Sequence, residues 1–388
     1  MTTASPLIPV TLLTGFLGSG KTTVLNHLVR QPEMADALVI INEFGEMALD
    51  HLLVAHSTEN LVMEMSSGCL CCTIRSDLVK TLRDITWRFS RNGQRKFRRV
   101  LIETTGLADP APIIHTLMTH PQIAPKYRLD GIVATVDLAA GMHTLDSHPE
   151  AVKQAAMADA LLLTKSDLAT DAQRTALLRR LDGINPAAPR WTVSNGEITP
   201  AKVLDLGLFS VEGKTPDVVR WLREEAYAES APRGQAHEGS DHHHGHHGGE
   251  HEHEHEHRHH GHAHGHEHEE HDHHDVNRHD DRIRAFCFAV DEPIPEEMLA
   301  AWLDVLMAFV GSNILRVKGI LNVEGHEGPI IVHGVQHIFH PPVPLPAWPN
   351  EDRRSRLVFI TRDVDRKTIE ETFHAFRQVL PQALERAA

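Results

Sequence analysis

A glycine-rich run follows the first apolar segment of the chain and reads Gly15-Phe16-Leu17-Gly18-Ser19-Gly20-Lys21-Thr22. It fits the pattern GxxxxGK[ST] and lies between an apolar segment, residues 10–14, and a helix-like segment, residues 21–30. The glycines let backbone N–H groups turn towards phosphate oxygens, and the start of a helix adds positive potential. We expect Lys21 to bridge the β- and γ-phosphates of a nucleotide and Thr22 to place its hydroxyl on Mg²⁺. The remaining contacts are expected from Gly15, Gly18, Ser19, Gly20 and Thr23. A glycine-rich turn without a ligand is the weaker alternative.

Short apolar segments alternate with helix-like segments as far as about residue 209. The apolar segments cover residues 10–14, 38–42, 100–103, 131–136 and 160–164, and the helix-like ones cover residues 21–30, 75–89, 151–157 and 171–181. Apolar runs without clean alternation suit parallel strands that are buried on both faces. We therefore predict an α/β fold, a doubly wound and mostly parallel sheet of the P-loop NTPase type, with ligands at the carboxyl ends of its strands.

A change of composition divides the chain into three parts. The length of 388 residues suits two domains, and the first is expected to cover residues 1–228. Residues 229–281 are nearly all His, Glu, Asp and Gly, and they cannot bury enough apolar surface to fold, so we predict a disordered linker. Residues 282–388 show a strand, a helix, three strands and a helix, which predicts a small α+β domain with a mostly antiparallel sheet. Cys287, between two phenylalanines, is expected in its core.

The run Thr164-Lys165-Ser166-Asp167 follows the apolar segment 160–164. A carboxylate at Asp167 can accept hydrogen bonds from both N1–H and N2–H of guanine, a pair of donors that adenine does not offer. The alternative is a plain helix start that Asp167 caps. We favour guanine recognition by Thr164, Lys165 and Asp167.

Two acidic loops complete the expected nucleotide site. Glu103 ends an apolar segment and stands three residues before Gly106. We expect the Glu103 carboxylate to act on Mg²⁺ and the Gly106 amide to meet the γ-phosphate. Glu43 and Glu46 follow the segment 38–42 and are expected to form the other nucleotide-sensing loop.

Three of the four cysteines stand together at Cys69, Cys71 and Cys72. Thiolates this close supply two or three ligands of a tetrahedral site for a soft metal such as Zn²⁺. No second Cys or His pair has zinc-site spacing, so Glu, His or water would complete the coordination, and such an incomplete site suits a metal that must leave. A redox pair, Cys69 and Cys72, and inert buried thiols are the alternatives.

Composition limits the compartment and the partners. Few cysteines, adjacent thiols and no export signal predict a cytoplasmic protein, and no apolar stretch approaches the roughly 20 residues of a membrane span. The formal net charge is −15, with thirteen acidic residues and two arginines in residues 237–281, and no basic field indicates nucleic-acid binding. That segment also holds 20 of the 32 histidines and can bind divalent ions weakly; a solvated linker or an expression tag is the alternative.

In order along the chain, the motifs resemble those of the CobW-like GTPases, a family of metallochaperones. The resemblance rests on TGFLGSGKTT, NEFGE, GCLCC, IETTGLADPAPI and TKSD, then on RVKG at residues 316–319 and VHGVQHIF at residues 332–339. It covers the chain apart from the His-rich segment and is strongest towards the YjiA-like, zinc-linked branch. It implies Mg²⁺-dependent GTP hydrolysis coupled to delivery of Zn²⁺, or of Co²⁺ or Ni²⁺, with metal contacts at Glu46, Cys71 and His120. Ile41 stands where close relatives can carry a metal-binding Glu.

The sequence thus predicts a GTPase that carries metal to a client protein. Lys21, Thr22 and Glu103 are its expected catalytic residues, and Thr22 and Glu103 are also the expected Mg²⁺ ligands. Glu43 and Glu46 are expected to link the γ-phosphate to the thiolates, and a nucleotide-dependent homodimer is a further expected partner. The alternatives are a non-enzymatic metal buffer with a vestigial nucleotide site, a cobalt or nickel insertion accessory protein, and a small-molecule kinase. No glutamine is evident in a position to orient the attacking water, so intrinsic hydrolysis is expected to be slow.

Overall fold

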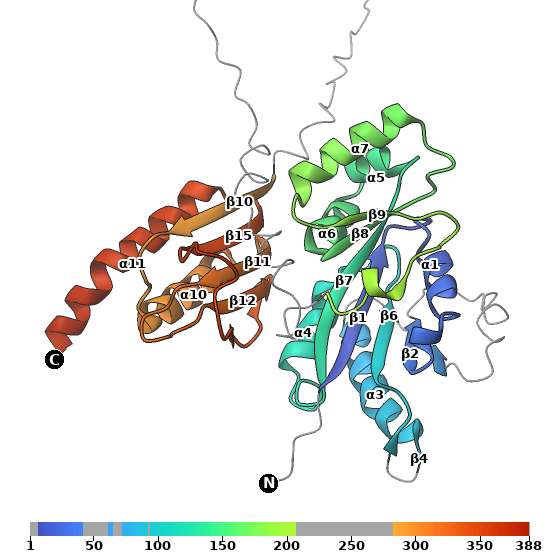
Figure 1. Ribbon diagram of the computed structural model, residues 1–388, viewed down its shortest axis with the longest axis horizontal. Helices are drawn as coiled ribbons and strands as arrows, with labels where there is room; N and C mark the ends of the chain where they lie inside the picture. Colours follow the sequence, from blue (N-terminus) through green and yellow to red (C-terminus); the bar gives the residue numbers. More distant parts are fainter. Residues whose placement is uncertain (1–6, 42–60, 65–71, 92–93, 207–281, 388) are drawn as a thin grey trace, which may run out of the picture.

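The computed structural model describes residues 7–41, 61–64, 72–91, 94–206 and 282–387 (Figure 1). Two lobes lie side by side: the N-terminal lobe, residues 7–206, and the C-terminal lobe, residues 282–387. The N-terminal lobe contains β1 (Ile8–Gly15), α1 (Lys21–Leu28), β2 (Ala37–Ile41), β3 (Leu61–Glu64), α3 (Cys72–Arg88), β4 (Ser90–Arg91), β5 (Gln94–Arg95), β6 (Arg99–Glu103), α4 (Ala111–Thr119), β7 (Tyr127–Asp137), α5 (Gly141–Ser147), α6 (Pro149–Met157), β8 (Ala160–Thr164), α7 (Asp171–Ile184) and β9 (Arg190–Thr192).

The central sheet of the N-terminal lobe has the strand order β3-β2-β6-β1-β7-β8-β9, and every pairing in it is parallel. Its two faces are covered by different helices. On β1, Leu12 belongs to a core with residues of α3, α4, α6 and α7, whereas Leu13 belongs to a core with residues of α1. Burial on both faces explains the continuous apolar runs in the sequence and confirms the predicted doubly wound α/β fold.

The C-terminal lobe is built on an antiparallel sheet. Its elements are β10 (Ile283–Val290), α10 (Glu296–Val310), β11 (Ile314–Leu321), β12 (Ile330–Val335), β13 (Ile338–Phe339), β14 (Val343–Pro344), β15 (Ser355–Arg362) and α11 (Arg366–Ala387). The order is β10-β15-β11-β12-β13, with β14 also paired to β12. The α+β prediction is confirmed, and the second of the three strands expected between the two helices is a hairpin of β12 and β13, because Gln336 adopts a left-handed φ of 53°.

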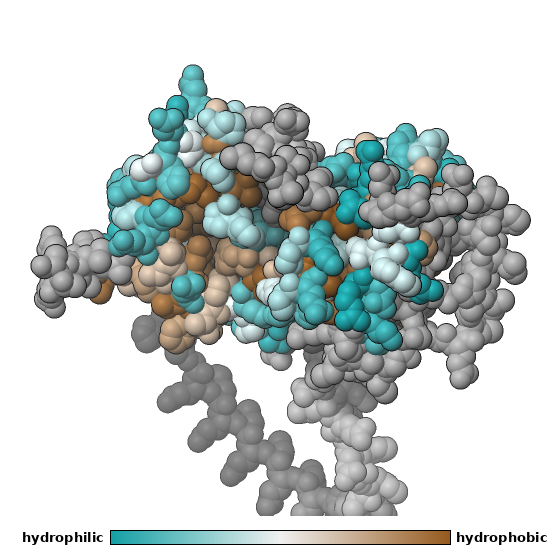
Figure 2. All heavy atoms as spheres, turned by 90° about the horizontal axis from the view of Figure 1, so that it is seen from below, coloured by the Kyte–Doolittle hydropathy of each residue, from teal (hydrophilic) through white to brown (hydrophobic). Residues whose placement is uncertain are grey.

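The sheet of the C-terminal lobe is also buried on both faces, and this joins the lobes. Along β10, Phe286 and Phe288 pack with α10 and α11, whereas Ala285 and Cys287 belong to the same core as residues of α6 and α7. Alternate side chains of a strand point to opposite faces, so one strand serves both cores. Cys287 is buried, as expected. Figure 2, which views the molecule from below, shows apolar side chains at the surface of the C-terminal lobe and near the junction of the two lobes.

A buried ion pair crosses the junction. Asp159, between α6 and β8, accepts hydrogen bonds from the Arg316 guanidinium and from Lys318, whose Nζ lies 2.9 Å away, and Arg316 also donates to the carbonyl of Met157 at 2.6 Å. Burial alone would raise the pKa of Asp159, but the charges of Arg316 and Lys318 hold it below its ordinary value. The residues of the RVKG motif therefore bind the C-terminal lobe to the N-terminal one.

Two histidines lie beside this ion pair. His333 Nε2 is 3.0 Å from an Arg316 nitrogen, and the rings of His333 and His340 are 4.8 Å apart. Burial and the neighbouring Arg316 charge lower the pKa of His340 to about 4. The same two causes, in the same order, lower the pKa of His333 well below its usual range. Both rings are therefore neutral at pH 7.

We expect acidification to destabilise the protein through His340. The unfolded chain takes up this proton near pH 6.5, whereas the folded chain resists it down to about pH 4. The free energy of unfolding should therefore fall as the pH drops through that window, by up to about 3 kcal/mol. Urea unfolding at pH 7, 6 and 5 should show a flatter pH dependence for His340→Gln than for the unaltered protein. His374→Gln, at an exposed position of α11, is the control, and an unchanged slope in His340→Gln would refute the assignment.

Candidate functional site

The glycine-rich run forms a tight loop between β1 and α1. Gly18 and Gly20 have left-handed φ values of 70° and 90°, and a Cβ on Gly15 would collide with the hydroxyl of Thr135 on β7. The hydroxyl of Ser19 donates to the carbonyl of Phe16 at 2.7 Å. Glycine is thus required here by backbone conformation and by close packing, and the conformation leaves the first amides of α1 at the carboxyl edge of the sheet.

An oxygen pair stands at the start of α1. Strand β6 lies beside β1, with Glu103 paired to Leu13, and the Thr22 hydroxyl donates to Glu103 Oε1 at 2.8 Å. Glu103 is buried, and the Nζ of Lys21 donates to the Phe16 carbonyl at 3.1 Å. Mg²⁺ prefers oxygen ligands, so a hydroxyl and a carboxylate beside the phosphate loop fit this ion.

The loop after β6 packs directly on the phosphate loop. A Cβ on Gly106 would lie only 2.6 Å from the Leu17 backbone nitrogen, and the Thr104 amide donates to the Leu13 carbonyl at 2.9 Å. From α6, the buried Gln154 donates through Nε2 to the carbonyls of Gly106, at 3.1 Å, and Ala108, at 3.0 Å. A movement of the Gly106 loop would therefore displace its contacts with both the phosphate loop and α6.

The expected base-binding loop also contacts the phosphate loop. The Thr164 hydroxyl donates to the Ser19 carbonyl at 2.7 Å. Lys165 has a left-handed φ of 53° and pairs with Asp137 at the end of β7, at 2.8 Å. Asp167 is exposed at the same edge, where its carboxylate can meet a ligand.

A second loop, after β9, lies beside this one. Ser194 Oγ is 3.3 Å from Ser166 Oγ, Asn195 and Gly196 have left-handed φ values of 51° and 82°, and a Cβ on Gly196 would collide with the Thr23 carbonyl. The sequence interpretation did not include this loop. The Asn-Gly pair after a short apolar stretch was a signal for a turn, but only the strand order places that turn at the site.

A cavity of about 230 Å³ adjoins the phosphate loop. Its lining includes Phe16, Ser19, Asp137, Gln154 and Lys165. It therefore lies between the phosphate loop, the end of β7, and α5 and α6. Neither Gln154 nor Asp137 was recognised from the sequence, because each stands in a segment without a motif.

Of the expected transition-metal ligands, the structure describes only His120 and the backbone of Cys72. Glu43, Glu46, Cys69 and Cys71 lie outside the described residues, and Cys72 is the first residue of α3, with its side chain likewise outside them. His120 follows the last residue of α4. In the part of the chain that the structure describes, no group of three or more His, Cys, Asp or Glu is arranged to hold a metal ion. Within that part, no helix is both long and apolar enough to cross a bilayer.

Family models match both lobes. Residues 9–192 match the model described as CobW/HypB/UreG, nucleotide-binding domain, and residues 283–377 match that of the cobalamin synthesis protein cobW C-terminal domain. The zinc chaperone YjiA of Escherichia coli is 30% identical over 96% of this chain and 99% of its own length. The zinc chaperone CobW of Pseudomonas aeruginosa is 30% identical over 93% of this chain and 89% of its own.

A solved structure shares the two-lobe architecture. The Zn(II)-bound YjiA GTPase from E. coli is similar with a TM-score of 0.64 and 26% identity, over 96% of this chain and 99% of that one. The likeness therefore extends beyond the nucleotide-binding lobe to the C-terminal lobe.

We expect Gly106→Ala to weaken nucleotide binding without unfolding the protein. The new Cβ must push the Leu17 backbone, and local strain of this kind costs of order 1–3 kcal/mol. Affinity for a fluorescent guanine nucleotide should therefore fall by about fivefold to 150-fold. Gly183→Ala on α7, where no atom lies within 4 Å of the added Cβ, is the matched control and should bind normally. Equal affinity in the two variants would show that the Gly106–Leu17 contact does not shape the site.

Proposed function

The chain belongs to the CobW/HypB/UreG family, and we propose that it is a Mg²⁺-dependent GTPase that carries Zn²⁺ to a client protein in the cytoplasm. The observation that carries the proposal is the convergence of three loops at one sheet edge. The phosphate loop, the Glu103–Gly106 segment and the Thr164–Asp167 segment are joined by the bonds of Thr22 to Glu103 and of Thr164 to Ser19. The zinc assignment follows relatives that are named zinc chaperones.

Each nucleotide-binding residue has a role that its position supports. Lys21 exchanges the Phe16 carbonyl for phosphate oxygens and offsets their charge, while the amides at the start of α1 donate to them. Thr22 and Glu103 would hold Mg²⁺, which supplies positive charge to the β- and γ-phosphates. Gly106 presents its amide to the γ-phosphate. Because it packs on Leu17, the loop that carries it would respond to whether that phosphate is present.

The strand that precedes the proposed cysteine ligands in sequence, β3, ends at the same sheet edge as the nucleotide site. Strand β3 runs parallel to β2, which is parallel to β6, so β3 ends with Glu64 at the sheet edge where Glu103 lies. Helix α3 then begins at Cys72. This placement supports Cys69, Cys71 and Cys72, with Glu46, as zinc ligands beside the nucleotide, and Glu43 and Glu46 as the link between them. Co²⁺ and Ni²⁺ are the alternative cargoes.

Asp167→Asn tests the choice of base. The amide replaces a carboxylate that accepts two guanine N–H groups, and loss of a charge-assisted pair should cost about 2–3 kcal/mol of GTP binding and shift preference towards xanthine nucleotides. GTP, ATP and xanthosine triphosphate affinities would be measured for this variant and for Asp171→Asn, an exposed acid in the first turn of α7. Unchanged GTP affinity in Asp167→Asn would remove the case for guanine specificity.

The coupling of metal to nucleotide tests the chaperone mechanism. Zn²⁺ affinity would be measured by competition titration with no nucleotide, with GDP and with a non-hydrolysable GTP analogue. If binding of the γ-phosphate changes the geometry of Cys69, Cys71 and Cys72, the free energy of Zn²⁺ binding should differ between the GTP-analogue and GDP states by about 1–3 kcal/mol. Zn²⁺ should then change the affinity for the GTP analogue by the same factor. Replacement of Cys69, Cys71 and Cys72 by Ser should abolish the difference. Equal zinc affinity in all three states would leave a GTPase without metal coupling.

A further inference from the structure

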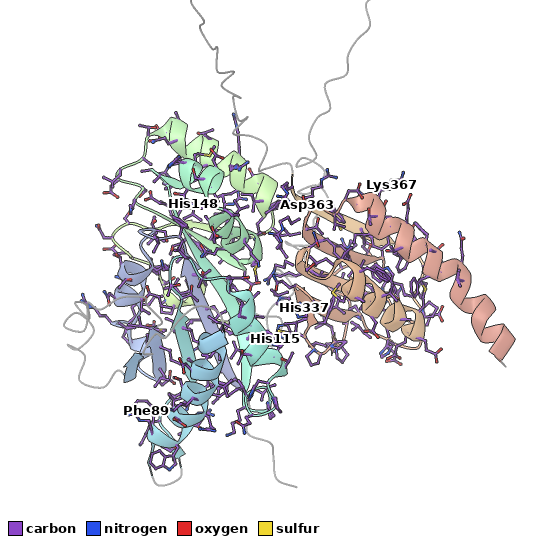
Figure 3. All side chains as sticks on the ribbon, turned by 180° about the vertical axis from the view of Figure 1, so that it is seen from behind. Phe89, His115, His148, His337, Asp363 and Lys367 are labelled. Atoms are coloured by element: carbon purple, nitrogen blue, oxygen red, sulfur yellow. The ribbon has the colours of Figure 1, made fainter. Side chains whose placement is uncertain are left out.

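Two histidines from different lobes face each other across the junction (Figure 3). His115 lies on α4 of the N-terminal lobe, and His337 lies in the turn between β12 and β13 of the C-terminal lobe. Their ring centroids are 5.7 Å apart, and the ring planes meet at 50°. Neither residue belongs to the nucleotide site or to the cysteine motif.

The hydrogen bonds of His115 favour the tautomer that carries its proton on Nδ1. The Thr119 hydroxyl has one proton, which it donates to the carbonyl of His115 at 2.9 Å. Its contact with His115 Nδ1, at 3.1 Å, must then run from Nδ1–H to the hydroxyl oxygen. His115 would then bind a metal ion through Nε2, and this arrangement, in which the other ring nitrogen donates to a protein oxygen, is typical of histidines that bind metal.

The position of His337 is set by a tight turn. Gln336 has a left-handed φ of 53°, and the hairpin pairs Val335 with Ile338, so His337 projects from a two-residue loop. A Cβ on Gly311, after α10, would lie 3.0 Å from the Cβ of His337. The turn is therefore packed on the end of α10, while the ring itself is exposed.

We propose that His115 and His337 bind one divalent transition-metal ion of the Zn²⁺ class and so bridge the two lobes. Two imidazoles on one tetrahedral ion at about 2.0–2.1 Å bring their ring centroids to about 5 Å, close to the observed separation. Two protein ligands leave two positions for water or for an incoming ligand. The site is thus suited to reversible occupation rather than to a permanent structural ion.

Because of where His115 lies, metal binding at the bridge should depend on which nucleotide is bound. This step rests on the proposed function. Helix α4 begins five residues after Gly106, so His115 is carried by the helix that follows the γ-phosphate loop. His337 belongs to the lobe that Arg316 ties to Asp159. A shift of the Gly106 loop would change the distance between the imidazoles, and metal at the junction would oppose that shift.

A double-mutant cycle on the full chain tests the bridge. Zn²⁺ binding would be measured without nucleotide, against a chromophoric chelator, for the unaltered protein, His115→Gln, His337→Gln and the double variant. The His-rich segment and the cysteines contribute equally to all four. Each single change should remove one binding equivalent or weaken it by at least about tenfold, and the double variant should lose no more than either single one. His143→Gln is the matched control, because His143 on α5 has the same contact with a hydroxyl four residues on, at 3.4 Å to Ser147.

The outcomes separate this inference from the proposed function. Unchanged zinc binding in the variants, or losses that simply add, would overturn the bridge even if GTP is hydrolysed. A non-additive loss in a protein that binds no GTP would support the bridge and refute the proposed function. If both hold, the affinity of the bridging site should differ between the GDP and GTP-analogue states, and that difference should vanish in His337→Gln.

Discussion

A buried carboxylate holds this molecule together. Asp159 lies in the N-terminal lobe, yet the charges that compensate it, Arg316 and Lys318, come from the C-terminal lobe. Replacing Arg316 in the docked protein would leave a buried charge short of compensation, which is strongly destabilising, so the packed junction requires this pairing between the lobes. The rings of His333 and His340 must stay neutral for the same reason, because a proton on either ring would place a further positive charge beside Arg316. The relative position of the lobes is therefore set by electrostatics as well as by the apolar core that they share.

The ion pair is connected to the nucleotide loops through one short helix. Near the middle of α6, Gln154 holds the carbonyls of Gly106 and Ala108; at its end, the Met157 carbonyl accepts from Arg316. A rigid helix bonded at both places transmits displacement better than a loop would. Helix α4 provides a second connection, since it starts beyond the same Gly106 loop and carries His115 to the junction. The C-terminal lobe is thus connected to the Gly106 loop through α6 and α4, a connection that its sequence motifs alone did not reveal.

The candidate site was predicted where its chemistry is local. Gly15 to Thr22, Thr164 to Asp167 and the Glu103–Gly106 segment are short runs whose spacing indicates a phosphate loop, a base-reading loop and an acidic strand end, and their roles towards a ligand stay predictions. Gln154, Asp137 and the loop of Asn195 and Gly196 were missed because each depends on a strand or helix that is distant in sequence. The roles of the metal-site residues remain predictions, and His120 stands at the end of α4 opposite to the Gly106 loop.

The sequence by itself indicated the parallel sheet of the N-terminal lobe, since its unbroken apolar runs suit strands buried on both faces and phosphate-loop glycines require a strand before them and a helix after them. It also determined the order of the nucleotide loops. Only the tertiary structure decided what RVKG and VHGVQHIF do: Arg316 reaches Asp159, and His337 reaches His115, each across more than 150 residues of chain. The physical reason is that the residues next to a charged side chain or an imidazole in the sequence do not identify the residue that it contacts in the folded protein. The partner is chosen by the packing of one sheet face against α6 and α7, a contact that no local pattern encodes.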